Sequence, residues 1–140
     1  MLVRFLMGVI ALCVVSTAAS AAIDCRIRSM PPASFVAKQV PDNVRYKGMP
    51  LADLQKLYRR MAGLPKRAAG LDYCSDPLGF VYPWDGKGRP TIYYPTDVTD
   101  RCEAEVIQHE EAHVKGWAIN HPGGNLQSGP CKGGKASNVS

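Results

Sequence analysis

The sequence lacks an uncharged apolar run of the roughly 20 residues that a membrane-spanning helix needs, and it contains no internal repeat. It is also short, because 140 residues leave room for one small domain and no second core. With 46% hydrophobic and 21% charged residues, the composition is that of a globular protein. These features exclude a multi-span membrane protein, a disordered chain and a collagen-like fibre.

Acidic residues are scarce relative to basic ones, since 12 Asp and Glu against 17 Lys and Arg give a formal charge of +5. The basic residues are scattered: Lys56, Arg59 and Arg60 fall on a predicted helix, and Lys66 and Arg67 fall in a predicted loop. We interpret this charge as a solvated surface and predict no nucleic-acid partner.

Residues 1–21 have the pattern of a secretory signal peptide. Arg4 supplies the positive start, residues 5–15 are apolar, and a run of small residues ends at Ala21 in an Ala-x-Ala-like site. We expect cleavage after Ala21, with Ala22 as the alternative. The mature protein would then be periplasmic or secreted and would have no stable membrane anchor.

No Cys-x-x-Cys pair occurs, which disfavours a cysteine-ligated metal site. Cleavage of the signal removes Cys13 and leaves four cysteines, Cys25, Cys74, Cys102 and Cys131. An even number in a small exported domain predicts two disulfides. Three connectivities are open, of which we favour Cys25–Cys102 together with Cys74–Cys131.

Hydrophobic periodicity predicts an α+β fold with two main helices on a small antiparallel sheet. Apolar residues recur at helical spacing from Leu51 to Met61, and a second helix is expected to run from an N-cap at Asp100 to Gly116. Residues 23–46 are expected to be irregular apart from one short strand. The domain is predicted to span residues 22–131, followed by a flexible tail over residues 132–140.

The strand pattern is confined to three short segments: residues 44–46, 80–82 and 91–94. The last two flank a Gly-containing segment, residues 85–88, and so predict a hairpin. Proline lacks the N–H that a central strand donates to its neighbour. Pro83, Pro90 and Pro95 are therefore expected to restrict these strands to short or edge positions.

The most informative stretch is His109-Glu110-Glu111-Ala112-His113, a His-Glu-x-x-His motif on a predicted helix. Four residues of helix bring both imidazoles to one face, where they can bind one Zn²⁺. Glu110 lies beside that face, where a general base that activates a water molecule is needed. The alternative interpretation is a charged helix end with histidines favoured by the helix dipole.

A catalytic zinc ion needs a third protein ligand, and His121 is the remaining histidine. Gly116 ends the helix and allows the chain to double back toward the metal. The competing ligand is a carboxylate such as Glu105, for which second-shell support of His109 is the other role. Tyr93 and Tyr94 are candidates for substrate or oxyanion positioning, although packing explains strand tyrosines equally.

The segment His109-Glu110-Glu111-Ala112-His113-Val114-Lys115-Gly116-Trp117, with the later His121-Pro122, resembles the active-site helix of zincin metallopeptidases, in particular small exported bacterial members. The resemblance implies a minimal zincin-like domain with zinc on His109 and His113 and with Glu110 as catalytic base. It also implies that the strand at residues 91–94 is an edge strand that lines an extended peptide. No methionine follows Met61, so a Met-turn of the metzincin kind is absent.

Together these patterns predict a zinc-dependent peptidase that acts on peptide or protein substrates in the periplasm or outside the cell. The alternative, from a different functional class, is a non-catalytic envelope module with a structural or relict zinc site. Glu110 separates the two, because a structural site gains nothing from a carboxylate at that position.

Overall fold

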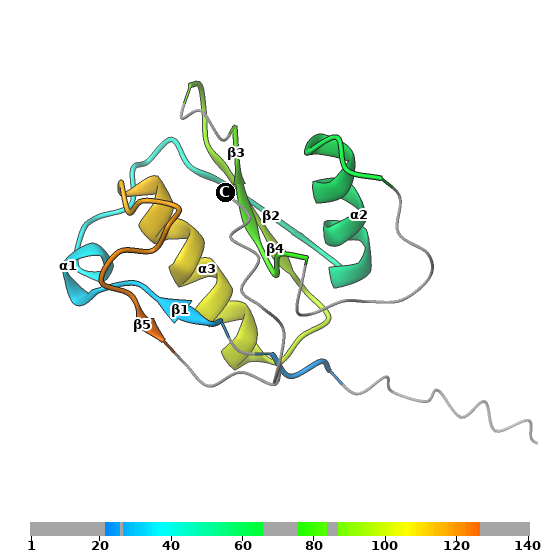
Figure 1. The fold of residues 1–140 in the computed structure, drawn as a ribbon, viewed down its shortest axis with the longest axis horizontal. Helices are drawn as coiled ribbons and strands as arrows, with labels where there is room; N and C mark the ends of the chain where they lie inside the picture. The colour runs from blue at the N-terminus through cyan, green and yellow to red at the C-terminus, as the bar shows by residue number, and fades with distance from the viewer. Residues whose placement is uncertain (1–21, 26, 66–75, 84–86, 127–140) are drawn as a thin grey trace, which may run out of the picture.

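The computed structural model describes residues 22–25, 27–65, 76–83 and 87–126 (Figure 1). The predicted signal peptide, the predicted tail, Cys74, Cys131 and part of the predicted hairpin turn lie outside these residues. In chain order the elements are β1 (Ser29–Met30), α1 (Ala33–Val36), β2 (Arg45–Met49), α2 (Leu51–Met61), β3 (Phe80–Tyr82), β4 (Thr91–Pro95), α3 (Asp100–Val114) and β5 (Asn125–Leu126). The predicted α+β class is therefore confirmed.

The main sheet has the strand order β2-β4-β3 and is mixed, so the prediction of an antiparallel sheet is wrong in part. β3 pairs antiparallel with β4, as the hairpin pattern predicts, but β2 pairs parallel with β4. Parallel neighbours need a long crossover connection, and here α2 and the residues after it supply one.

β4 lies in the centre of the sheet, so the expectation that residues 91–94 form an edge strand is also wrong. Pro90 precedes the strand and Pro95 is its last residue, positions where a missing N–H costs little. Because β2 and β3 flank β4, an extended peptide cannot pair with it. Any strand addition to this sheet must use β2 or β3.

The two long helices cover opposite faces of the sheet (Figure 1). Leu54 and Tyr58 of α2 pack with Phe80 and Tyr93, whereas Val106 of α3 packs in a second cluster that contacts Tyr94. Neighbouring residues of a strand point to opposite faces, which is why Tyr93 and Tyr94 belong to different clusters. The helix predicted from Leu51 to Met61 is confirmed.

Helix α3 begins one residue earlier than its sequence pattern predicts. Thr99 is the N-cap, and its hydroxyl accepts a hydrogen bond from the backbone N–H of Cys102 at 3.4 Å. Asp100, the predicted N-cap, is the first helical residue. Its negative charge is still stabilised there by the positive N-terminal end of the helix dipole.

Residues 23–46 are more regular than predicted, because they contain β1 and the short helix α1. Pro32 precedes α1 as its N-cap, so the proline starts a helix here instead of breaking one. β1 pairs antiparallel with β5 in a second, two-stranded sheet beside α3. This packing brings the N-terminal segment against the motif helix (Figure 1).

A disulfide joins Cys25 to Cys102, which confirms one of the two favoured pairings. Both cysteines are buried. Arg101 reinforces the junction, because its guanidinium donates to the carbonyl oxygen of Cys25 at 2.9 Å and contacts the Asp24 carboxylate. The N-terminal segment is thus tied covalently to the first turn of α3.

Among the described residues, no helix has the length and apolar character needed to cross a membrane.

Candidate metal centre

Helix α3, which carries the His-Glu-x-x-His sequence, ends in a Schellman motif that reverses the chain. The N–H of Trp117 donates to the carbonyl oxygen of Ala112 at 2.9 Å, and the N–H of Gly116 donates to that of His113 at 3.0 Å. Gly116 has φ +96°, a conformation that glycine adopts without steric cost. The reversal predicted at Gly116 is confirmed, and it returns His121 to the helix.

Backbone carbonyl groups fix the two histidines of the helix. Nδ1 of His109 lies 2.7 Å from the carbonyl oxygen of Ser29, and Nδ1 of His113 lies 2.9 Å from that of Trp117. A carbonyl oxygen only accepts hydrogen bonds, so both Nδ1 atoms must carry the proton. Each Nε2 of the neutral rings is therefore a lone-pair donor available to a metal ion.

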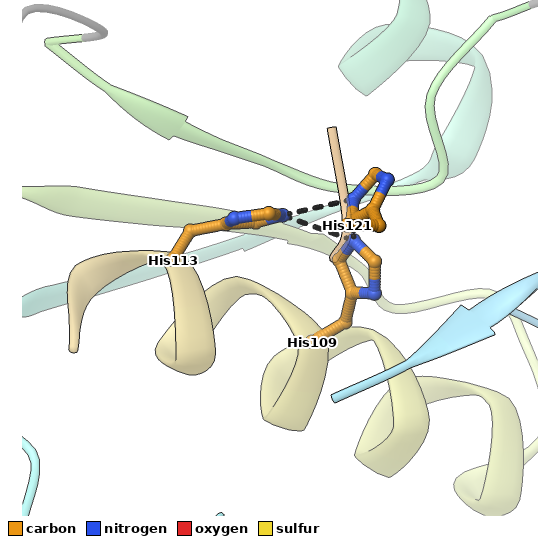
Figure 2. Close-up of side chains that lie close together, drawn as sticks. All are labelled: His109, His113 and His121. Atoms are coloured by element: carbon orange, nitrogen blue, oxygen red, sulfur yellow. Dashed lines mark hydrogen bonds between the residues drawn. The ribbon is translucent and has the colours of Figure 1, made fainter. Parts of the chain in front are cut away.

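His121 completes the group. Its Nε2 lies 3.1 Å from Nε2 of His109 and 3.2 Å from Nε2 of His113, and those two atoms are 3.2 Å apart. Figure 2 shows the three rings, two from α3 and one from the returning loop, directed at one point. His121 has φ +55°, an uncommon conformation for a residue other than glycine. The three predicted ligands are thus brought together.

The arrangement fits a bound cation. Two acceptor nitrogens at 3.2 Å, as in His109 and His113, cannot share a hydrogen bond. Protonation does not relieve the repulsion near neutral pH, because burial, followed by repulsion from the other two rings, lowers the pKa of His109 to about 3. Burial also lowers the pKa of His113 and of His121. Three converging ring nitrogens on neutral imidazoles are therefore suited to a metal ion.

Glu110 lies on the sheet-facing side of the same helix and is 6% exposed. Its side chain packs against Gly79, where an added Cβ would lie 3.2 Å from Cγ of Glu110 and 2.5 Å from Cγ1 of Val106. Burial raises the pKa of Glu110 to about 8. No described residue donates a hydrogen bond to its carboxylate. Glu110 is thus a buried carboxyl group on the same helix as His109 and His113.

Trp117 forms the floor of the histidine group and is 2% exposed. Its ring stacks on His113 at 5.2 Å and lies 5.3 Å from the ring of His109 and 4.8 Å from that of His121, between centroids. The sequence places this residue next to Gly116 but gives no sign of its contact with all three rings. The carbonyl groups of Ser29 and Trp117 have no sequence signature at all, since every residue carries one.

Among the described residues, Glu105, Tyr93 and Tyr94 make no hydrogen bond or ring contact with the three histidines. Glu105 accepts a hydrogen bond from Arg101 at 2.8 Å, and the group bonded to Nδ1 of His109 is the Ser29 carbonyl. Tyr93 stacks on Phe80 at 4.7 Å on the α2 side of the sheet. Tyr94 faces the α3 side and lies over Gly48, where an added Cβ would be 2.9 Å from Cζ of the ring.

A surface hollow of about 240 Å³ lies over β2 and β4. Its walls include Tyr93, which belongs to the α2 side of the sheet, and no histidine lines it. The hollow is therefore separate from the histidine group.

No family model, curated protein or solved structure significantly matches the chain.

Proposed function

We propose that this protein hydrolyses peptide bonds with a zinc ion held by His109, His113 and His121 and with Glu110 as general base. The observation that carries the proposal is the convergence of three Nε2 atoms, 3.1–3.2 Å apart, beside a buried carboxylate on the same helix. A bound zinc ion supplies Lewis acidity, which polarises a carbonyl group and lowers the pKa of water.

The donor set supports zinc in particular. Imidazole nitrogens bind zinc at about 2.0–2.1 Å in a tetrahedron, which places them about 3.3 Å apart. The observed separations of 3.1–3.2 Å are close to that value. Three protein ligands are also the number that catalytic zinc sites use, because the fourth position is left for water or substrate.

The position of Glu110 on the helix supports the role of general base. It follows His109 directly, lies about 100° around the helix from it, and is buried where little solvent competes for its carboxylate. In the proposed reaction Glu110 takes a proton from the attacking water and passes it to the leaving amine, so the side chain ends in its starting state. A nearby cation lowers the pKa of a carboxyl group, which opposes the effect of burial and favours the ionised base.

The substrate is proposed to lie along β3. Gly79, which directly precedes this strand, packs against Glu110, so β3 starts next to the proposed base. β3 pairs only with β4 among the described residues, and its other edge faces away from the sheet. An extended peptide that adds to this edge would run past Glu110.

The Cys25–Cys102 disulfide is compatible with the proposed periplasmic or extracellular location.

Glu110→Gln tests the proposal, with Glu111→Gln as the matched control on the next residue of the helix. Gln keeps the shape of Glu but cannot accept the proton. We expect all three proteins to bind zinc, and Glu110→Gln alone to cleave a broad peptide mixture at least about 100-fold more slowly, as measured by mass spectrometry. Equal rates in both variants, or no zinc-dependent cleavage by the wild type, would contradict the proposal and favour a non-catalytic zinc module.

A further inference from the structure

Trp117 contacts His113 and the segment that carries His121 through different groups. Its carbonyl oxygen accepts the hydrogen bond from Nδ1 of His113 at 2.9 Å, and its indole stacks on the same ring with planes 15° apart. Its indole N–H donates to the carbonyl oxygen of Pro122 at 3.0 Å. Because Pro122 follows His121 directly, this last bond fixes the segment that presents the third ligand.

The loop around His121 needs such an anchor. A residue other than glycine at φ +55° costs of order 1 kcal/mol or more, and the conformation persists only when the surroundings impose it. Two backbone bonds close the turn: the N–H of His121 donates to Ala118 at 2.9 Å, and the N–H of Gly124 donates to His121 at 3.2 Å. Besides the contacts of the His121 ring with the other two histidines, the indole bond to Pro122 connects this turn to the buried Trp117.

The fit around the indole leaves little room for rearrangement. An added Cβ at Gly124 would lie 2.9 Å from Cζ2 of Trp117 and 2.2 Å from Oγ of Ser29. On another side Phe35 packs against the indole with ring centroids 6.4 Å apart. The indole is thus held between the returning loop, α1 and the histidines.

We propose that Trp117 is a positioning residue that holds His113 and His121 in ligand geometry and thereby sets the metal affinity of the site. The inference rests on the proposed metal site and goes beyond it, because it assigns the pre-organisation of two ligands to one residue. A ligand held in place before binding loses less conformational freedom when the metal arrives, which raises affinity.

A double-mutant cycle tests the inference. The metal affinities of wild type, Trp117→Phe, His121→Ala and the double variant are measured by competition with a chelating dye, with Zn²⁺ and Co²⁺ as probes. We expect His121→Ala to weaken binding more than about tenfold in the wild type but less than about twofold in Trp117→Phe, because His121 is no longer presented there. The visible spectrum of bound Co²⁺ should lose tetrahedral character in both single variants.

Phe35→Leu is the matched control, since it alters packing on the indole and leaves the bond to Pro122 in place. In that background the effect of His121→Ala should stay above about tenfold. If Trp117→Phe does not fold, 3-benzothienylalanine at position 117 removes only the N–H donor and takes its place in the cycle. Additive effects of the Trp117 and His121 changes would overturn the inference without affecting the proposed hydrolysis, whereas Glu110→Gln tests hydrolysis without affecting this cycle.

Discussion

The carbonyl oxygen of Ser29 lies 2.7 Å from Nδ1 of His109, although 80 positions separate the two residues. This bond sets the tautomer of His109 and directs its Nε2 toward the other two histidines. The N-terminal segment is therefore part of the candidate metal centre. The Cys25–Cys102 disulfide ties the same segment to α3 four residues before Ser29.

The first prediction concerns this disulfide. Replacing both Cys25 and Cys102 by Ala should lower the free energy of unfolding by up to about 4.5 kcal/mol, from the entropy of a loop that spans 77 positions. It should also weaken metal binding, because Ser29 is then less firmly placed against His109. Urea unfolding and a chelator competition measure the two effects. Unchanged metal affinity in a folded double variant would show that the disulfide does not affect the metal site.

The second prediction concerns the third ligand. His121→Ala should weaken zinc binding by more than about tenfold, since loss of a ligand costs at least as much as loss of an outer-shell partner. The disulfide and both long helices do not depend on this side chain, so the far-UV circular dichroism should be unchanged. Ile119→Ala is the control, because Ile119 is 61% exposed on the same turn. Equal zinc affinity in the two variants would show that His121 is not a zinc ligand.

The third prediction concerns Gly124. Gly124→Ala should destabilise the protein by about 1–3 kcal/mol, because the new methyl group would overlap Oγ of Ser29 and press on the indole of Trp117. Ser29→Ala should recover part of this loss by removing the nearer obstacle, the Ser29 hydroxyl. Thermal unfolding of the two single variants and the double variant measures the rescue. A double variant that is no more stable than Gly124→Ala would show that the hydroxyl is not the obstacle.

The fourth prediction concerns the pH dependence of stability. The hydroxyl of Tyr46 donates to the Glu111 carboxylate at 2.7 Å, and burial together with this bond raises the pKa of Tyr46 to about 12. The folded state therefore favours the protonated phenol. Its contribution is complete below pH 10, the ordinary pKa, and is lost as the pH rises toward 12.

Tyr46→Phe should abolish this contribution at every pH. Its stability deficit relative to wild type should be small at pH 8, because Tyr46 is 46% exposed, and should shrink further above pH 10. Urea unfolding at several pH values measures it. A deficit that grows with pH would have the wrong sign for this hydrogen bond.

Local patterns in the sequence predict the elements better than their arrangement. The spacing of Leu51, Leu54 and Tyr58 defines α2 because one helical face must be apolar to be buried. The place of β4 depends instead on β2, which lies more than 40 positions earlier in the chain. Prolines at the ends of β4 carry no information about that neighbour, so the sequence suggests an edge strand where the fold has a central one.

In the candidate site, too, local sequence patterns predict some features, whereas others depend on how distant segments pack. His109 and His113 are predictable because a helix fixes their relative position over four residues, and His121 because it is the one remaining histidine. Ser29 and Trp117 contribute carbonyl oxygens, which no residue type marks in a sequence. Their roles follow only from the packing of β1 and from the Schellman motif after α3.

The most direct test of the central claim is a zinc titration of metal-free protein that begins at residue 22, followed by calorimetry. The account predicts saturable binding of one zinc ion per chain, and loss of that binding when His109, His113 and His121 are replaced together by Ala. Absence of saturable binding to the wild type, or undiminished binding to the triple variant, would contradict it.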